Sequence, residues 1–236
     1  MKLRNITLAL ALSSMSVLAE DLQVELDARK DKFTKTAPEE TIVEYNKGIK
    51  SVQESGVLEK ALNVGDSAPD FTLKNAVGKD VTLSKLLKDG PVVLTWYRGS
   101  WCPYCNITLR NYQEHLDEFK KAGAQLVALS PELPDKSLPT TEKHALEFEV
   151  LTDLNSEVAK KYGIVFTMTK WVEDAMRDYA DLKKYNGASY DDTTLPLSAT
   201  YIIQPDGKIS YAFLDAEYRN RATADQILES LKSTEK

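Results

Sequence analysis

Short apolar runs alternate with amphipathic stretches along most of this chain. Residues 91–96 and 125–130 are apolar and rich in β-branched side chains, a pattern typical of buried strands. Between these two runs, apolar side chains recur at helical spacing, at Leu109, Tyr112, Leu116 and Phe119. We therefore predict one helix, ended by Ala122-Gly123, that connects two parallel strands in a right-handed crossover.

The rest of the chain continues this alternation. Residues 71–73 and 81–83 flank a Gly-Lys-Asp turn, and residues 200–203 and 209–213 flank a Pro-Asp-Gly turn, so each pair predicts a hairpin. The other expected elements are a helix at 84–89, a proline-rich loop at 131–139, a helix at 141–146, a strand at 150–153, a helix at 156–162 and a closing helix at 222–231. This order predicts an α/β fold with a central mixed sheet flanked by helices.

Two helical segments lie outside this alternating core. Residues 20–63 are interpreted as an N-terminal arm that packs on the domain or on a partner subunit, and a partly mobile extension is the alternative. Residues 166–195 are interpreted as a helical insertion with one apolar face, formed by Trp171, Val172, Ala175, Met176, Tyr179 and Leu182. That face serves either ordinary packing or a lid over the two cysteines of the chain.

Residues 1–19 have the pattern of a secretory signal peptide. Lys2 and Arg4 precede an apolar run from Ile6 to Leu18, which a small residue follows. That run is too short to span a bilayer comfortably, so we expect an exported, periplasmic protein whose mature form has no membrane span. Removal of the segment takes away two basic residues and no acidic ones, which changes the formal net charge from −6 to −8. An acidic chain argues against nucleic acid as a partner.

Both cysteines lie in Cys102-Pro103-Tyr104-Cys105, directly after the first buried strand. Proline is favoured at the first position of a helix, so Pro103 predicts that Cys102 is the helix N-cap. The Cys102 sulfur would then face the free N–H groups of the first turn, which favour a thiolate. We predict that Cys102 is the exposed attacking sulfur, that Cys105 is the resolving one, and that the two form a redox-active disulfide.

A structural disulfide and a metal site are the alternatives for these cysteines. A structural disulfide gains most from closing a long loop, and a two-residue spacer closes a short one. The only histidines, His115 and His144, fall in solvated helical stretches, so we expect neither a metal nor another cofactor. The spacing of the chain places no carboxylate near the motif.

Three motifs make the sequence similar to a known family. They are Gly65-Asp66-x-Ala68-Pro69-Asp70-Phe71, Tyr97-Arg98-Gly99-x-Trp101-Cys102-Pro103-Tyr104-Cys105 and Ala199-Thr200-Tyr201-Ile202-Ile203-x-Pro205-Asp206-Gly207. On these motifs the chain resembles the peroxiredoxin-like branch of the alkyl hydroperoxide reductase/thiol-specific antioxidant family, within the thioredoxin-fold superfamily. The resemblance implies a thioredoxin-like domain at residues 64–236, a Cys102 that attacks peroxide, and turnover by an external thiol reductant of the thioredoxin or glutathione type.

A peroxidase of this kind needs more than a low thiol pKa. Lowering the pKa from about 8.5 to about 5.5 raises the thiolate fraction at neutral pH roughly 30-fold. The nucleophilicity of the sulfur, however, falls roughly 15- to 30-fold, so donors to the leaving oxygen are required. Arg98 is the nearest catalytic candidate, with a structural ion pair as the alternative, and Ser100, Trp101 and Ser198 are weaker candidates for positioning the substrate.

The sequence departs from the family pattern around Cys102. Standard peroxiredoxins have a threonine three residues before the attacking cysteine and a proline seven before it, where this chain has Gly99 and Thr95. They also use a later arginine, but no arginine occurs between Asn111 and Met176. Part of the peroxide-binding apparatus is therefore expected to be missing or replaced.

The sequence Cys-Pro-Tyr-Cys is also that of the glutaredoxin active site. Glutaredoxins carry a cis-proline that faces the cysteines, and the matching position here is Ser198, with Pro196 two residues earlier. The sequence therefore indicates two alternative functions. The family resemblance favours a thiol peroxidase acting on hydrogen peroxide or organic hydroperoxides, and the Cys-Pro-Tyr-Cys sequence favours a thiol–disulfide oxidoreductase of the cell envelope. A non-catalytic redox-sensing or binding module is a third. The sequence does not decide the substrate, the reductant or whether the chain forms a homo-oligomer.

Overall fold

The computed structural model describes residues 21–234, so the signal peptide predicted at residues 1–19 lies outside the described residues. Its strands are β1 (Thr72–Asn75), β2 (Asp80–Thr82), β3 (Val92–Trp96), β4 (Gln125–Ser130), β5 (Glu149–Thr152), β6 (Val165–Thr167), β7 (Thr194–Pro196), β8 (Thr200–Ile203) and β9 (Ile209–Phe213). Its helices are α1 (Leu22–Thr36), α2 (Glu39–Glu54), α3 (Val57–Lys60), α4 (Leu83–Leu86), α5 (Pro103–Glu114), α6 (Leu116–Lys121), α7 (Pro134–Lys143), the 3-10 turn η1 (Leu154–Ser156), α8 (Glu157–Lys161), α9 (Lys170–Tyr179), α10 (Leu182–Asn186) and α11 (Ala224–Thr234).

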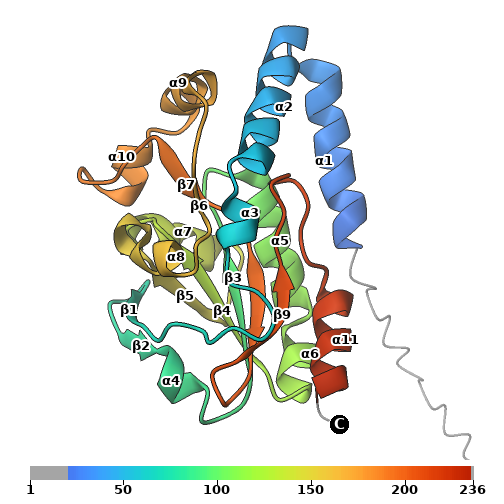
Figure 1. Ribbon diagram of the computed structural model, residues 1–236, viewed down its shortest axis with the longest axis vertical. Coiled ribbons are helices and arrows are strands. Elements are labelled where there is room, and N and C mark those ends of the chain that lie inside the picture. The colour runs from blue at the N-terminus through green and yellow to red at the C-terminus, as the bar shows by residue number, and fades with distance from the viewer. Residues whose placement is uncertain (1–20, 235–236) are drawn as a thin grey trace, which may run out of the picture.

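A mixed seven-stranded sheet forms the centre of the molecule, in the order β2-β1-β5-β4-β3-β8-β9 (Figure 1). Strands β3, β4 and β5 are parallel, whereas β1 and β8 pair antiparallel to their neighbours. The predicted crossover from β3 to β4 and both predicted hairpins are present. The α/β class with a central mixed sheet is therefore confirmed.

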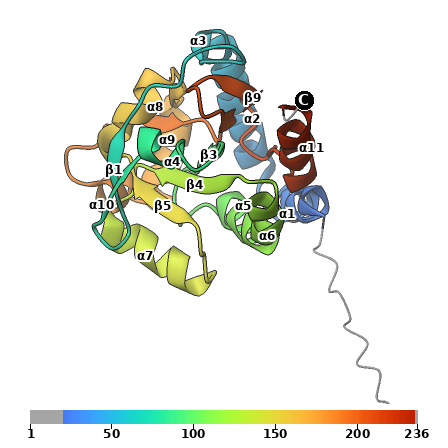
Figure 2. The ribbon, with the colours of Figure 1, turned by 90° about the horizontal axis from the view of Figure 1, so that it is seen from below.

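Successive side chains of the central strands enter two different cores, as the twofold repeat of a strand requires. Val93 packs with α5, α6 and α11, whereas its neighbours Val92 and Leu94 pack with α3, α4 and α8. Figure 2 shows α5, α6 and α7 on one side of β4 and β5, with α8 on the other. Because both faces of the sheet are covered, the central strands are mostly apolar, and every residue of β3 is buried.

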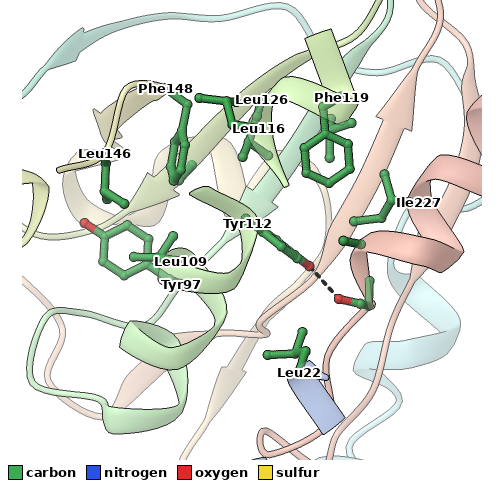
Figure 3. Packing of buried hydrophobic residues seen from close by; sticks show 14 of the residues in the cluster. Leu22, Tyr97, Leu109, Tyr112, Leu116, Phe119, Leu126, Leu146, Phe148 and Ile227 are labelled. Atoms are coloured by element: carbon green, nitrogen blue, oxygen red, sulfur yellow. Dashed lines mark hydrogen bonds between the residues drawn. The ribbon is translucent and has the colours of Figure 1, made fainter. Parts of the chain in front are cut away.

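The predicted single helix after the cysteines is in fact two helices, α5 and α6. His115 takes φ −97° and ψ 5°, and its carbonyl accepts the N–H groups of Glu118 and Phe119, so that a new helix begins there. Both helices pack on the same core, in which Figure 3 shows Tyr112 among the apolar side chains with its hydroxyl donating to the Ala222 carbonyl at 2.7 Å. The apolar spacing is kept across the break, which is why the sequence pattern did not reveal it.

The proline-rich loop at 131–139 and the helix at 141–146 were predicted wrongly, because helix α7 already begins at Pro134. Proline at the first helical position costs no hydrogen bond, and the Leu133 carbonyl accepts the Ser137 N–H to close the first turn. Pro139 lies inside the helix on its exposed side. The packing of α7 on β5 outweighs the loss of one hydrogen bond at that residue.

The arm and the insertion both contact the central domain and each other. Helix α1 lies along α5, with Leu22 and Leu26 buried and Glu25 paired with Arg110, while α2 packs on α9 (Figure 1). The insertion is two helices rather than one, because Ala180 has extended backbone (φ −150°, ψ 93°) and separates α9 from α10. No helix among residues 21–234 is long and apolar enough to cross a membrane.

Candidate active site

The two cysteines lie where β3 ends and α5 begins. Cys102 is the N-cap residue and Pro103 the first residue of α5, as predicted. The side chain of Arg98 lies over the motif, with its Nη2 donating to Cys102 Sγ at 3.2 Å. The backbone N–H of the same residue donates to Cys105 Sγ at 3.4 Å. One arginine therefore contacts both sulfurs.

Two details of the predicted Cys102 geometry are wrong. Its sulfur is not exposed, since Cys102 has 0% relative accessibility and belongs to the core that includes Tyr104 and Leu109. No first-turn N–H group donates to it either. The guanidinium of Arg98 donates to the sulfur instead. A side chain from the preceding turn therefore stabilises a charge on Cys102 more directly than the N-terminus of α5 does.

The environment separates the pKa values of the two thiols. Burial alone would raise the pKa of Cys102, but a hydrogen bond from Cys105 and the charges of Arg98 and Arg221 outweigh burial and hold that pKa well below its usual range. Burial and the adjacent Cys102 sulfur raise the pKa of Cys105 well above its usual range, although both arginines oppose this. The shared proton therefore resides on Cys105, and Cys102 carries the negative charge.

Two aromatic rings hold the Arg98 guanidinium in place. Its central carbon lies 4.0 Å from the ring centre of Tyr218 and 5.1 Å from that of Trp101. Burial opposes the charge of Arg98, but the Cys102 and Cys105 sulfurs outweigh it and raise the arginine pKa. The ion pair that Arg98 forms is thus with a sulfur of the motif.

Arg221 is a second cation at the site, and no motif of the sequence indicated it. It is buried in the segment before α11, and its Nη2 lies 3.7 Å from Cys105 Sγ. Hydrogen bonds to the carbonyls of Tyr218 and Asn220 orient the guanidinium. More than a hundred residues separate Arg221 from Cys105 along the chain, so only the fold brings this cation to the motif.

Gly99 occupies the family's threonine position for a steric reason. Its φ is +153°, in the region that favours glycine. A Cβ built there would meet Nε1 of the Trp101 indole at 2.2 Å. The close approach of Trp101 over this turn therefore excludes any larger residue.

Ser100 is anchored to Glu132, a buried acid that the sequence analysis missed. Both the backbone N–H and the hydroxyl of Ser100 donate to Glu132 Oε1, at 2.8 and 2.7 Å. Glu132 is fully buried just beyond β4, and its Oε2 has no hydrogen-bond partner. Burial raises the pKa of Glu132 to about 7, even though the two Ser100 hydrogen bonds lower it. The carboxyl group fixes the turn that carries Arg98.

We expect Glu132→Gln to stabilise the protein more at pH 8 than at pH 5. The folded protein holds the Glu132 proton up to about pH 7, whereas an unfolded chain loses it at about pH 4.3. Unfolding therefore releases a proton between these values, and the free energy of unfolding falls by about 4 kcal/mol as the pH rises through them. Glutamine does not titrate, so the difference in the free energy of unfolding between the variant and the wild type should grow over that pH range. Urea unfolding at several pH values measures it, and a pH-independent difference would contradict the assignment.

The remaining candidate residues differ in whether they contact the active site. Trp101 covers Arg98, and its carbonyl accepts the Tyr179 hydroxyl of the insertion at 3.1 Å. Ser198 is buried with an unpartnered hydroxyl, and no described contact joins it to either cysteine. Pro196 ends β7 in a trans peptide bond. His115 pairs with Glu118 near the far end of α5.

The fold and a buried pair of cysteines at a strand-to-helix junction define a thioredoxin-fold thiol oxidoreductase. The family model described as the AhpC/TSA family matches residues 64–212, and the chain belongs to that family. The N-terminal arm precedes the matched region. The resemblance to the peroxiredoxin-like branch of this family, which the sequence motifs indicated, is confirmed.

Curated relatives and solved structures agree with this assignment. Peroxiredoxin Bcp of Escherichia coli (strain K12) is 29% identical over 171 residues, which is 72% of this chain and 96% of that protein. Chloroplastic peroxiredoxin Q of Populus jackii is 28% identical over 172 residues, 73% of this chain and 69% of that protein. The crystal structure of peroxidoxin BcpB from Mycobacterium tuberculosis has a TM-score of 0.57 at 23% identity and covers 73% of this chain and 97% of its own. The thioredoxin-like fold and the predicted class, an oxidoreductase of the peroxiredoxin type, are thus confirmed.

Proposed function

We propose that this protein is a thiol peroxidase in which Cys102 attacks hydroperoxides and Cys105 resolves the product. The Cys102 thiolate displaces the leaving oxygen of the O–O bond, which takes up a proton and departs as water or an alcohol, and the sulfur becomes a sulfenic acid. The Cys105 thiol then attacks that sulfur, the sulfenic oxygen leaves as water, and a Cys102–Cys105 disulfide forms. Two external thiols, or one dithiol, supply the two electrons that restore the pair and are themselves oxidised to a disulfide.

The contact between Arg98 and Cys102 carries this proposal. A guanidinium 3.2 Å from the attacking sulfur both favours the thiolate and lies where charge develops on a leaving oxygen. Arg221 supplies the same charge beside Cys105, so each sulfur has its own cation. The proton on Cys105 keeps this second sulfur out of the first step.

The identity of the relatives supports peroxide as the oxidant. Those named above are peroxiredoxins, and the full burial of Cys102 favours a small electrophile over a protein disulfide. The Cys-Pro-Tyr-Cys sequence is the observation that favours thiol–disulfide exchange instead. We further propose that the protein acts outside the cytoplasm, with a thioredoxin- or glutathione-type thiol as its reductant.

The rate at which hydrogen peroxide oxidises the fully reduced mature protein tests the function. Trp101 adjoins Cys102, so its fluorescence in a stopped-flow experiment should report the reaction. A second-order rate far above that of a free thiolate is expected. A rate equal to that of a free thiolate would leave disulfide exchange as the better explanation, and small disulfides would then be tested as oxidants.

A further inference from the structure

The segment between β9 and α11 brings Arg221 to the second sulfur of the motif. Arg221 is buried, with 5% relative accessibility, and its Nη2 lies 3.7 Å from Cys105 Sγ. The guanidinium of Arg98, in contrast, donates to Cys102, and only the backbone N–H of Arg98 donates to Cys105. The two sulfurs therefore contact different guanidinium groups.

Hydrogen bonds on both sides of Arg221 fix its position. Its Nη1 donates to the carbonyls of Tyr218 and Asn220, which leaves Nη2 for the sulfur. The next residue, Ala222, accepts the hydroxyl of Tyr112 at 2.7 Å (Figure 3). Tyr112 belongs to α5, the helix that begins within the motif. That helix therefore holds the segment that places the guanidinium.

Arg221 differs from the other buried arginine of this segment in its partner. Arg219 pairs with Glu217, whereas none of the ion pairs among residues 21–234 joins an acidic side chain to Arg221. A charged group in a protein interior is costly unless an opposite charge lies nearby. The free Nη2 of Arg221 contacts the sulfur of Cys105, so this cation is placed for a negative charge on that sulfur.

The negative charge has to move from one sulfur to the other during the proposed cycle. In the reduced protein, burial and the adjacent Cys102 raise the pKa of Cys105, and Arg221 opposes them more than Arg98 does. Oxidation of Cys102 to a sulfenic acid removes its thiolate charge. The repulsion from that sulfur is then lost while both guanidinium groups remain, so charge can develop on Cys105 beside Arg221.

We propose that Arg221 is a catalytic residue of the resolving step, in which its guanidinium stabilises the negative charge that develops on Cys105 Sγ. The proposal rests on the peroxidase function and assigns a residue to its second half-reaction. The Cys105 sulfur attacks the Cys102 sulfur, and the S–S bond forms as the S–O bond breaks. The oxygen leaves with the electron pair of that bond, takes up the proton of the Cys105 thiol and departs as water. No further oxidant or reductant takes part.

The other titratable groups near Cys105 do not supply this charge. Tyr97 and Glu132 both interact electrostatically with Cys105. A phenol and a carboxyl group are neutral or negative, so neither stabilises a thiolate by its charge. Arg98 is positive, but its guanidinium donates to Cys102. Removal of Arg221 should therefore affect the second step more than the first.

The partition of the Cys102 sulfenic acid between two products tests this role. Dimedone traps the sulfenic acid, whereas Cys105 converts it into the disulfide, and mass spectrometry measures both products. In Arg221→Met the ratio of disulfide to adduct at neutral pH should fall about 10²-fold, the usual cost of removing one donor to developing charge. The ratio does not depend on how fast the sulfenic acid forms. A slow reaction with peroxide would thus refute the peroxidase function, and the ratio would still test Arg221.

Two further variants separate the charge of Arg221 from its packing. Arg221→Lys keeps a positive charge without the guanidinium fork and should give a higher ratio than Arg221→Met. Arg219→Met is the matched control, because it removes an equally buried guanidinium that contacts Glu217 instead of a sulfur, and it should keep the wild-type ratio. Equal ratios in wild type and Arg221→Met would overturn the proposal, and so would equal losses in Arg221→Met and Arg221→Lys.

The pH dependence of the ratio is a second readout. Removal of the cation raises the pKa of Cys105 further, so the ratio should rise more steeply with pH in Arg221→Met than in the wild type. A purely structural role would lower the ratio by the same factor at every pH, which would contradict the proposal. If methionine prevents folding, Arg221→Gln, which keeps hydrogen-bond donors without the charge, takes its place in both experiments.

Discussion

Replacement of Cys102 by serine should reduce peroxide-driven oxidation to background, whereas Cys105→Ser should retain the first step. The reason is that the two thiols have different pKa values. Cys105 and two arginines lower the pKa of Cys102 and favour its thiolate, whereas the raised pKa of Cys105 keeps that residue protonated. A serine hydroxyl without an adjacent base is a weak nucleophile at neutral pH. The Cys105→Ser protein should therefore accumulate a sulfenic acid on Cys102 that cannot condense to the disulfide.

Mass spectrometry after dimedone labelling distinguishes the two variants. One adduct on Cys102 is expected in Cys105→Ser and none in Cys102→Ser. In the wild type, a loss of two hydrogens without an adduct indicates the disulfide. An adduct on Cys105 in the Cys102→Ser protein would show that the roles of the two cysteines are reversed.

Arg98→Met should lower the rate of oxidation by hydrogen peroxide about 10²- to 10³-fold at neutral pH, the usual cost of removing one donor to developing charge. Two effects combine in this loss. The pKa of Cys102 rises when its closest cation is removed, and the leaving oxygen loses its donor. Methionine keeps an apolar side chain between Trp101 and Tyr218, which limits the structural change.

The pH dependence separates the two effects. In the wild type, Arg98 and Cys105 hold the pKa of Cys102 well below its usual range, so the rate should rise less steeply with pH than it does in the variant. In Arg98→Met the rate should rise with pH towards the ordinary thiol range near 8.5, and the deficit that persists at pH 9 measures the lost donor. Arg219→Met is the matched control, because Arg219 also stacks on Tyr218 but pairs with Glu217. A parallel pH profile for wild type and Arg98→Met would exclude a direct effect on the thiolate.

The elements that form from nearby residues were predictable from the sequence. The apolar runs at β3 and β4, the helix after Pro103 and the two hairpins each depend on neighbouring side chains, and all of them are present. The position of Cys102 as an N-cap followed from Pro103 alone. The start of α7 did not, because proline composition indicates a loop unless the packing that stabilises the helix is known.

The surroundings of the two sulfurs, in contrast, depend not only on the local Arg98 but also on residues distant in the chain. Arg221, Glu132 and Tyr218 reach the motif from separate segments, and nothing in local spacing relates them to Cys102. A thiol pKa depends on burial and on charges within a few ångströms, and both are set by chain crossings that bring those segments together. The sequence by itself thus predicted the fold and the two cysteines as the reactive pair, because both follow from neighbouring residues, while only the tertiary structure decided that Cys102 is buried and which distant side chains surround the two sulfurs.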